Sequence, residues 1–164
     1  MALHGCDHTF EQLALDVFPS VFSSLCQSLQ QPIALRAFYD APSLIPAHSG
    51  CYVIAQRGTP LYVGIAKNMQ RRIQDHLSGD PSRANLAVRM AAKSLGVGLS
   101  AIKKHAQFDP AFESAKQRLL GCEVAWVSIS NPLEMYIFEP YCAMKLDTCD
   151  YNFFDTLQIL APKR

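Results

Sequence analysis

The sequence has 164 residues, of which 49% are hydrophobic and 18% are charged. This length suffices for one domain with a single core, and the composition excludes an intrinsically disordered chain. The formal net charge of +1 excludes a uniformly basic tail that binds nucleic acid along its whole length.

The start of the chain has the pattern of helices. Thr9 stands three residues before Gln12, as in a capping box, and apolar residues then recur at helical spacing. We expect Pro19 to interrupt this helix and a second apolar stripe to form another one. We therefore predict an N-terminal helical extension over residues 1–48, followed by one compact unit over residues 49–164.

Cysteine and histidine near the N-terminus offer side chains that bind metals. The residues are His4, Cys6 and His8. Because the ends of a chain tend to fray, we do not expect a metal site there. The six cysteines form no Cys-x-x-Cys pair and lie mostly in apolar stretches, which favours free buried thiols over a disulfide framework.

No leader peptide is recognisable, and no apolar run approaches the roughly 18 residues that a membrane span needs. We therefore expect a cytoplasmic protein with no membrane partner. Reducing conditions in that compartment agree with free thiols.

The expected secondary structure after residue 48 mixes strands and helices. Two short runs rich in β-branched and aromatic residues flank a turn at Arg57–Pro60 and predict a β-hairpin. A further strand is expected over residues 122–129. Helices are expected over residues 68–77, 84–95, 110–120 and 132–146, the last one capped by Asn131.

The positive charge is concentrated in the middle of the chain. Residues 66–104 carry eight basic and two acidic residues, a net charge of +6, and the remainder carries −5. A solvated helix face explains such a run, and so does a surface that binds a polyanion. Charge alone leaves both interpretations open.

Several residue types suited to phosphate chemistry follow the hairpin. Tyr52 and Tyr62 lie on the two expected strands, and Arg72 and His76 are four residues apart, so both can face one site. Glu139 stands in an apolar helical stretch, where a carboxylate needs a cation or an arginine as its partner. The ordinary alternative is that the tyrosines pack and Arg72 forms a structural ion pair.

The same residues resemble the GIY-YIG nuclease superfamily. The stretch 50–54 followed by 62–72 and His76 is similar to the opening of this domain, and 138–141 through Asn152 to its closing element. The resemblance implies a small α+β fold with a short, mainly antiparallel sheet flanked by helices. Cys51 and Val63 replace isoleucines of the family pattern, which a strand tolerates.

The resemblance also implies a role for each matching residue. Tyr52 and Tyr62 correspond to the paired tyrosines, Arg72 to the catalytic arginine, and Glu139 to the ligand of one divalent cation, Mg²⁺ or Mn²⁺. The other two catalytic candidates are His76 and Asn152. Glu134 is an alternative to Glu139, but five helical positions rotate a side chain by about 140° net, so only one of them can face the site. The interval to Asn152 favours Glu139.

The basic segment supplies the candidates for substrate binding. They are Lys67, Arg71, Arg83, Arg89 and Lys93. Much of this segment falls in residues 78–121, which we interpret as a helical insertion that helps to grip nucleic acid; the alternative is a packing element with solvated charges.

The sequence therefore predicts a metal-dependent endonuclease acting on double-stranded or branched DNA, in repair or restriction. A binding module that no longer cuts and a structural or interaction domain are the alternatives. A homodimer is possible, because one site cuts one strand, and Phe10, Phe18 and Phe22 could form its interface or complete the monomer core.

Overall fold

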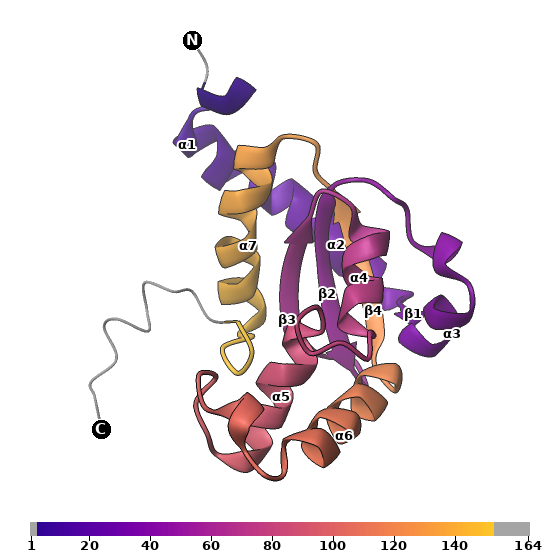
Figure 1. Cartoon of the computed structure of the whole chain (residues 1–164). Coiled ribbons are helices and arrows are strands. Elements are labelled where there is room, and N and C mark those ends of the chain that lie inside the picture. Colours follow the sequence, from indigo (N-terminus) through magenta and orange to yellow (C-terminus); the bar gives the residue numbers. More distant parts are fainter. Residues whose placement is uncertain (1–2, 153–164) are drawn as a thin grey trace.

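The computed structural model describes residues 3–152 and contains a central antiparallel sheet (Figure 1). Its strands lie in the order β1-β4-β2-β3, and every neighbouring pair is antiparallel. The strands are β1 Ile33–Ala34, β2 Gly50–Gln56, β3 Thr59–Ala66 and β4 Glu123–Ser128. This arrangement confirms the expected α+β class.

The predicted hairpin forms with a shorter turn than expected. Arg57 and Gly58 are its two central residues, both with positive φ, 51° and 77°, as a tight turn between twisted strands requires. Thr59 and Pro60 belong to β3 instead of the turn. The pairing register shifts beside Pro60, which has no N–H to donate to the neighbouring strand.

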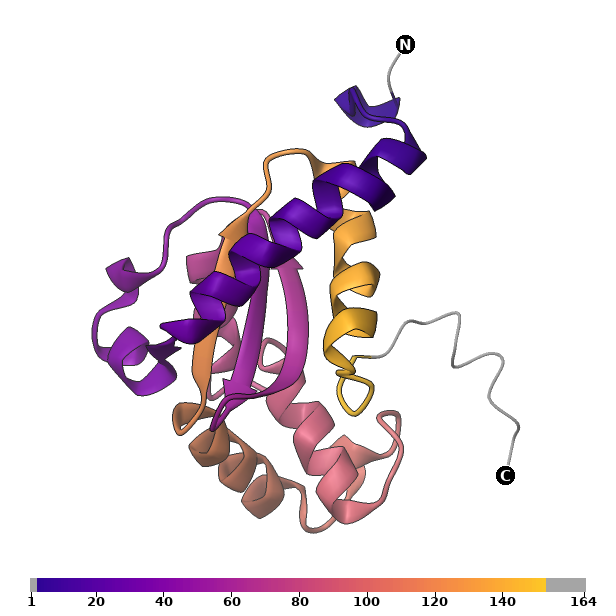
Figure 2. The same ribbon diagram turned by 180° about the vertical axis from the view of Figure 1, so that it is seen from behind.

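Helices cover both faces of the sheet (Figures 1 and 2). One core cluster contains Tyr52, Ile54 and Tyr62 with residues of α3, α4, α5 and α6. The other contains Val53 and Val63 with residues of α2 and α7. The bounds are α1 Phe10–Gln12, α2 Phe18–Gln30, α3 Leu35–Asp40, α4 Met69–His76, α5 Asn85–Leu95, α6 Phe108–Leu120 and α7 Pro132–Leu146.

The N-terminal helices join into one rod, contrary to the expected interruption at Pro19. The capping box of Thr9 and Gln12 begins α1, a π-helical turn over Leu13–Val17 follows, and α2 continues from Phe18. Pro19 sits in the first turn of α2 directly after the π segment. A wider turn there accommodates a residue that lacks an N–H donor. The prediction of two separate helices was therefore wrong.

The N-terminal segment contributes to the core of the whole described chain. Phe18 is 3% exposed and packs against Phe138 and Tyr141 of α7, and Phe22 also contacts Tyr141. Strand β1 extends the sheet beyond β4. Of the three phenylalanines considered for a dimer interface, Phe18 and Phe22 therefore pack within the monomer, whereas Phe10 is exposed.

The described residues end at Asn152. Residues 153–164, the end of the unit expected over 49–164, lie outside them. Among residues 3–152, no helix combines the length and the apolar character needed to cross a bilayer.

Candidate active site

The two tyrosines share one face of the hairpin. Tyr52 pairs with Gly64 across the strands and Ile54 pairs with Tyr62, so the tyrosines are diagonal neighbours. Their ring centroids are 6.3 Å apart. Tyr52 is fully buried and Tyr62 is 8% exposed. The hairpin register thus brings both hydroxyls to one site.

Two glycines allow this packing. A Cβ at Gly64 would lie 2.4 Å from the Tyr52 hydroxyl oxygen, so the Tyr52 ring needs the bare backbone of its cross-strand neighbour. A Cβ at Gly50 would lie 2.3 Å from the Val127 carbonyl oxygen and 2.8 Å from the Met69 sulfur. Gly50 therefore permits the close approach of β4 and α4 to β2.

Helix α4 directs a cation and an imidazole at the tyrosines. The Asn68 side chain caps the helix by accepting a hydrogen bond from the Arg71 N–H at 2.9 Å. One turn separates Arg72 from His76, and the Tyr52 hydroxyl and His76 Nε2 are hydrogen-bonded at 2.7 Å. The rings of Tyr62 and His76 also meet edge to face. Tyr52, Tyr62 and His76 therefore form one buried aromatic cluster.

His76 is neutral under ordinary conditions. Burial, reinforced by the charges of Arg72 and Arg89, lowers its pKa to about 3. Its Nδ1 is buried without a hydrogen-bond partner among the described residues. A neutral imidazole can accept the hydrogen of the Tyr52 hydroxyl at Nε2.

Burial also controls the protonation of both tyrosines. It raises the pKa of Tyr52 well above 10, an effect to which Tyr62 adds and which Arg72 partly opposes. Burial likewise raises the pKa of Tyr62, opposed by Arg89 and Arg72. Both phenols are therefore protonated near neutral pH.

Glu139 reaches the site from α7, which packs beside the edge strand β3 (Figure 1). Burial raises the pKa of its carboxyl, while Arg89 and Arg72 act in the opposite direction. Glu139 in turn raises the pKa of both tyrosines. The carboxylate, the two guanidinium groups and the two phenols are thus close enough to perturb one another.

The alternative carboxylate, Glu134, lies elsewhere. Its Oε1 is 2.9 Å from His8 Nδ1, beside the N-terminal segment. The side chains of Glu134 and Glu139 consequently face different parts of the structure, as their five-residue spacing on the helix predicts.

Asn152 holds the edge of the sheet. Its Oδ1 accepts a hydrogen bond from the Val63 N–H at 2.9 Å, and its Nδ2 donates to the Val63 carbonyl at 2.7 Å. This pair replaces the neighbouring strand that β3 lacks on that side. Asn152 therefore positions Val63, the residue next to Tyr62. Both polar atoms of its side chain are hydrogen-bonded to the Val63 backbone.

The five cations expected to bind substrate fall into two groups. Lys67, Arg71, Arg83 and Lys93 are exposed. Arg83 forms an ion pair with Asp75, and Lys93 with Asp150. Exposed ion pairs are worth only about 0–1 kcal/mol, so an anionic ligand can compete with them. Arg89 differs from these four because it is half-buried and perturbs His76, Tyr62 and Glu139.

Arg89 lies close enough to His76, Tyr62 and Glu139 to affect their pKa values, whereas the sequence placed it only among the surrounding substrate-binding cations. Its Nη1 donates to the carbonyl of Tyr151 at 2.7 Å, a partner that the sequence did not indicate. One feature of the sequence could have indicated this role: Arg89 is the single charged residue within the apolar run from Leu86 to Ala92. A lone cation in such a run needs a partner, as Glu139 does.

Comparisons with known proteins identify part of the chain. Residues 48–120 match the family model of the GIY-YIG catalytic domain. The resemblance inferred from the sequence is therefore confirmed for this part of the chain. Tyr52, Tyr62, Arg72, His76 and Arg89 lie within the matched segment, and Glu139 and Asn152 lie beyond it.

Solved structures of the GIY-YIG N-terminal endonuclease domain of UvrC from Thermotoga maritima are similar to this chain. The magnesium-bound domain is 19% identical, with a TM-score of 0.42, covering 71% of this chain and 97% of that one. A point mutant bound to its catalytic divalent cation is 19% identical, with a TM-score of 0.42, over 72% of this chain and 97% of that one. The comparison with curated proteins gives no match.

Proposed function

We propose that the protein is a divalent-cation-dependent endonuclease that hydrolyses phosphodiester bonds in DNA. The observation that carries the proposal is the buried 2.7 Å hydrogen bond between Tyr52 and His76, beside Arg72, Arg89 and Glu139. Packing alone does not require two cations, a carboxylate and a paired phenol at one point. Phosphoryl transfer uses each of these groups.

Arg72 and Arg89 would hold the non-bridging oxygens of the phosphate. A guanidinium presents several N–H donors in a planar fork and stays charged at any working pH. Negative charge grows on these oxygens as water attacks, so donors already in place stabilise the transition state more than the bound substrate. Arg89 is held toward Tyr151 and Arg72 toward the Arg83 carbonyl, which limits the reorganisation required.

Glu139 would hold the divalent cation. Carboxylate oxygens suit Mg²⁺ or Mn²⁺, and Mg²⁺ commonly binds through one or two carboxylates while keeping several waters. The partial burial of Glu139 and its raised pKa fit this role, because a cation would compensate for the desolvation of the carboxylate. The bound ion would polarise the phosphate and stabilise the leaving oxygen.

Tyr52 would take the proton of the attacking water while passing its own proton to His76. The raised pKa excludes a free phenolate as the resting base. Neutral His76 is in place to accept the phenolic proton at Nε2, so the water proton ends on the Tyr52 oxygen and the phenolic proton on the imidazole. The negative charge of the bound phosphate would stabilise the imidazolium that forms.

The exposed cations would bind the DNA backbone around this site. Lys67, Arg71, Arg83 and Lys93 belong to the +6 segment. Arg89 and Lys93 line a cavity of about 690 Å³ between α5 and the turn after α7. Phosphate contacts of this kind release counterions, so affinity should fall steeply as salt rises.

The test compares cleavage by the parent and two arginine variants. Supercoiled plasmid, a branched junction and a flap substrate are incubated with purified protein in Mg²⁺ or Mn²⁺. Arg72→Ala should slow cleavage by about 10²–10³-fold, the usual cost of losing one transition-state donor. Arg36→Ala is the matched control, because it removes an exposed arginine of α3 that lies outside the basic segment.

Circular dichroism must show that both variants fold. Cleavage by Arg72→Ala at the parental rate would overturn the mechanism. Binding of all three substrates by the parent without any product would favour a non-cleaving binding module. The ratio of nicked to linear plasmid would distinguish the two active forms. A single chain cuts one strand and gives nicked plasmid first, whereas a homodimer gives linear plasmid directly.

A further inference from the structure

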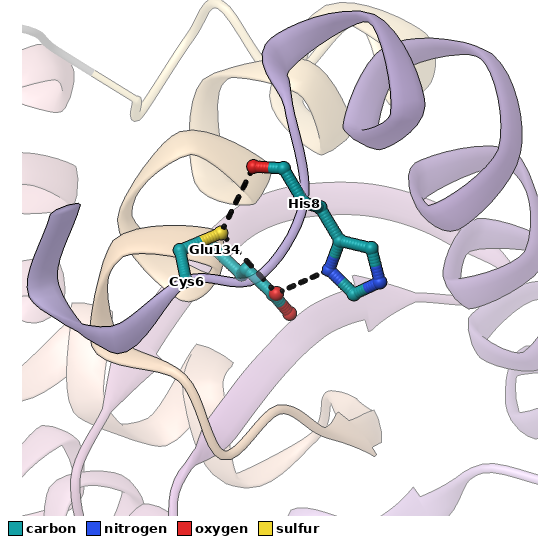
Figure 3. Close-up of side chains that lie close together, drawn as sticks. All are labelled: Cys6, His8 and Glu134. Carbon is teal, nitrogen blue, oxygen red and sulfur yellow. Dashed lines mark hydrogen bonds and ion pairs between the residues drawn. The ribbon is translucent and has the colours of Figure 1, made fainter. Parts of the chain in front are cut away.

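A second group of polar side chains lies at the N-terminal end of α7. Cys6, His8 and Glu134 converge there (Figure 3), and one ligand atom from each lies within 4.8 Å of the others. Glu134 is in the first turn of α7, whereas Cys6 and His8 belong to the segment before α1. Residues 126 or more positions apart in sequence therefore meet at one point.

The N-terminal segment is held in place, contrary to the expectation that it frays. Cys6 is 6% exposed and belongs to the core cluster around α7. The Asn131 side chain donates a hydrogen bond to the His4 carbonyl at 3.3 Å. The cluster accordingly joins two elements that are already packed together.

We propose that Cys6, His8 and Glu134 bind a zinc ion that fastens the N-terminal segment to α7. Thiolate sulfur, imidazole nitrogen and carboxylate oxygen are the three donor types that bind Zn²⁺ in proteins. Mg²⁺ prefers oxygen ligands alone, so this site and the carboxylate of Glu139 call for different metals.

Two of the three distances between ligand atoms are near those of a tetrahedral site, and Cys6 Sγ and His8 Nδ1 lie within 4.8 Å of each other. Usual zinc bond lengths place neighbouring ligand atoms about 3.4–3.6 Å apart. Cys6 Sγ and Glu134 Oε1 are separated by 3.5 Å, and His8 Nδ1 and Glu134 Oε1 by 2.9 Å. The second distance needs to lengthen by about half an ångström, which the half-exposed His8 side chain permits.

A simple ion pair accounts for only part of the cluster. His8 and Glu134 alone would form an exposed pair of small energetic value. The buried thiol of Cys6 adds a hydrogen bond to the same Glu134 oxygen at 3.5 Å, which places a zinc-binding sulfur on the inner side. The cavity lined by Asp7, His8 and Glu134 leaves room for a water molecule as the fourth ligand.

The experiment measures zinc binding by the full chain. The protein is stripped with a chelator, and Zn²⁺ is titrated against a chromophoric competitor. The parent should bind one zinc per chain at this site. Cys6→Ser and Glu134→Gln should each weaken binding at least about tenfold, since even the loss of an outer partner of a metal ligand costs that much.

Two control variants separate this site from other donors. Cys149→Ser removes an exposed thiol outside the cluster, and His4→Ala removes an imidazole of the same segment. Both should keep the parental affinity. Affinity should also rise with pH, because Cys6 must lose its proton to bind the metal.

Co²⁺ in place of Zn²⁺ gives an independent readout. The Co²⁺ complex of Cys149→Ser should show thiolate-to-metal charge-transfer absorption and the visible bands of a tetrahedral ion. This spectrum is measured on a chain that keeps Cys6, so it does not depend on whether Cys6→Ser folds. Absence of the charge-transfer band, or parental zinc affinity in a folded Cys6→Ser variant, would overturn the proposal.

Discussion

Helix α7 carries two carboxylates into contrasting surroundings. Glu139 is half-buried beside β3, where burial raises its pKa and the charges of Arg89 and Arg72 lower it. Glu134, five residues earlier, meets a thiol and an imidazole of the N-terminal segment. The partners that the fold brings to each glutamate, rather than the carboxylate itself, decide which chemistry that glutamate can support.

The largest expected effect is a loss of Mg²⁺-dependent cleavage, without a loss of zinc binding, when Glu139 is replaced. Glu139→Gln should lower Mg²⁺-dependent cleavage by about 10²–10³-fold, because the proposed cation loses its charged ligand. The same variant should still bind one zinc per chain. Single-turnover plasmid cleavage and zinc titration on one protein sample measure both.

Glu113→Gln, on the exposed side of α6, is the control for the loss of a carboxylate. If Glu139→Gln lost both cleavage and zinc, the two regions would not be independent. The contrast between Glu139 and Glu134 would then fail.

Gly64→Ala tests how tightly the active-site region is packed. The new Cβ would lie 2.4 Å from the Tyr52 ring and hydroxyl, so Tyr52 must move. Overpacking of this kind costs about 1–3 kcal/mol of stability, and we also expect cleavage to fall because the Tyr52 to His76 hydrogen bond is displaced. Urea unfolding followed by Trp126 fluorescence measures the stability.

Gly98→Ala is the matched control, since its Cβ would meet nothing within 4 Å. Its stability should stay close to that of the parent. Equal stability of the Gly64→Ala variant would show that the hairpin yields easily at this point.

The pH dependence of stability should report the buried imidazole. His76 has a pKa of about 3 in the folded chain against an ordinary value of 6.5, so between these values the unfolded chain binds a proton that the folded chain does not. The stabilisation present above pH 6.5 is therefore lost as the pH falls toward 3. The loss should reach about 2 kcal/mol by pH 5.

Unfolding by urea at neutral pH and at about pH 5 tests this dependence. His76→Gln should remove most of the difference between the two conditions, whereas His105→Gln, at an exposed loop position, should not. A parental difference in His76→Gln would assign the acid sensitivity to other groups.

The smallest effect concerns the N-terminal end of α7, next to Glu134. Asn131 caps the helix by accepting hydrogen bonds from the N–H groups of Leu133 and Glu134 at 2.9 and 3.1 Å. Asn131→Ala should cost about 1 kcal/mol, and Asn131→Ser should restore most of it. Thermal unfolding in the presence of chelator measures both variants.

A larger loss in Asn131→Ala would show that its contact with the His4 carbonyl matters more than the cap. In that case Asn131→Ser would fail to restore stability. The N-terminal segment would then depend on Asn131 for its attachment.

Local signals in the sequence predicted much of the fold. The β-branched hairpin, the Asn131 cap and the helical spacing in α4 reflect backbone preferences of adjacent residues. Strand β1 escaped notice because two residues carry no periodicity and acquire their conformation by pairing with β4. The expected break at Pro19 does not occur for a related reason. A π-helical turn directly before Pro19 lets the helix continue past a residue without an N–H donor, and the local sequence does not signal that turn.

Local periodicity in the sequence predicts the hairpin with its paired tyrosines and the four-residue spacing that puts Arg72 and His76 on one helix face. These features depend on strand and helix periodicity, which is set within a few residues. The tertiary structure decided that Arg89 joins the site, that Asn152 binds the edge of β3, and that Cys6 and His8 meet Glu134. Such meetings depend on the packing of α5 and α7 against the sheet, and no local pattern encodes contacts between residues so far apart in the chain.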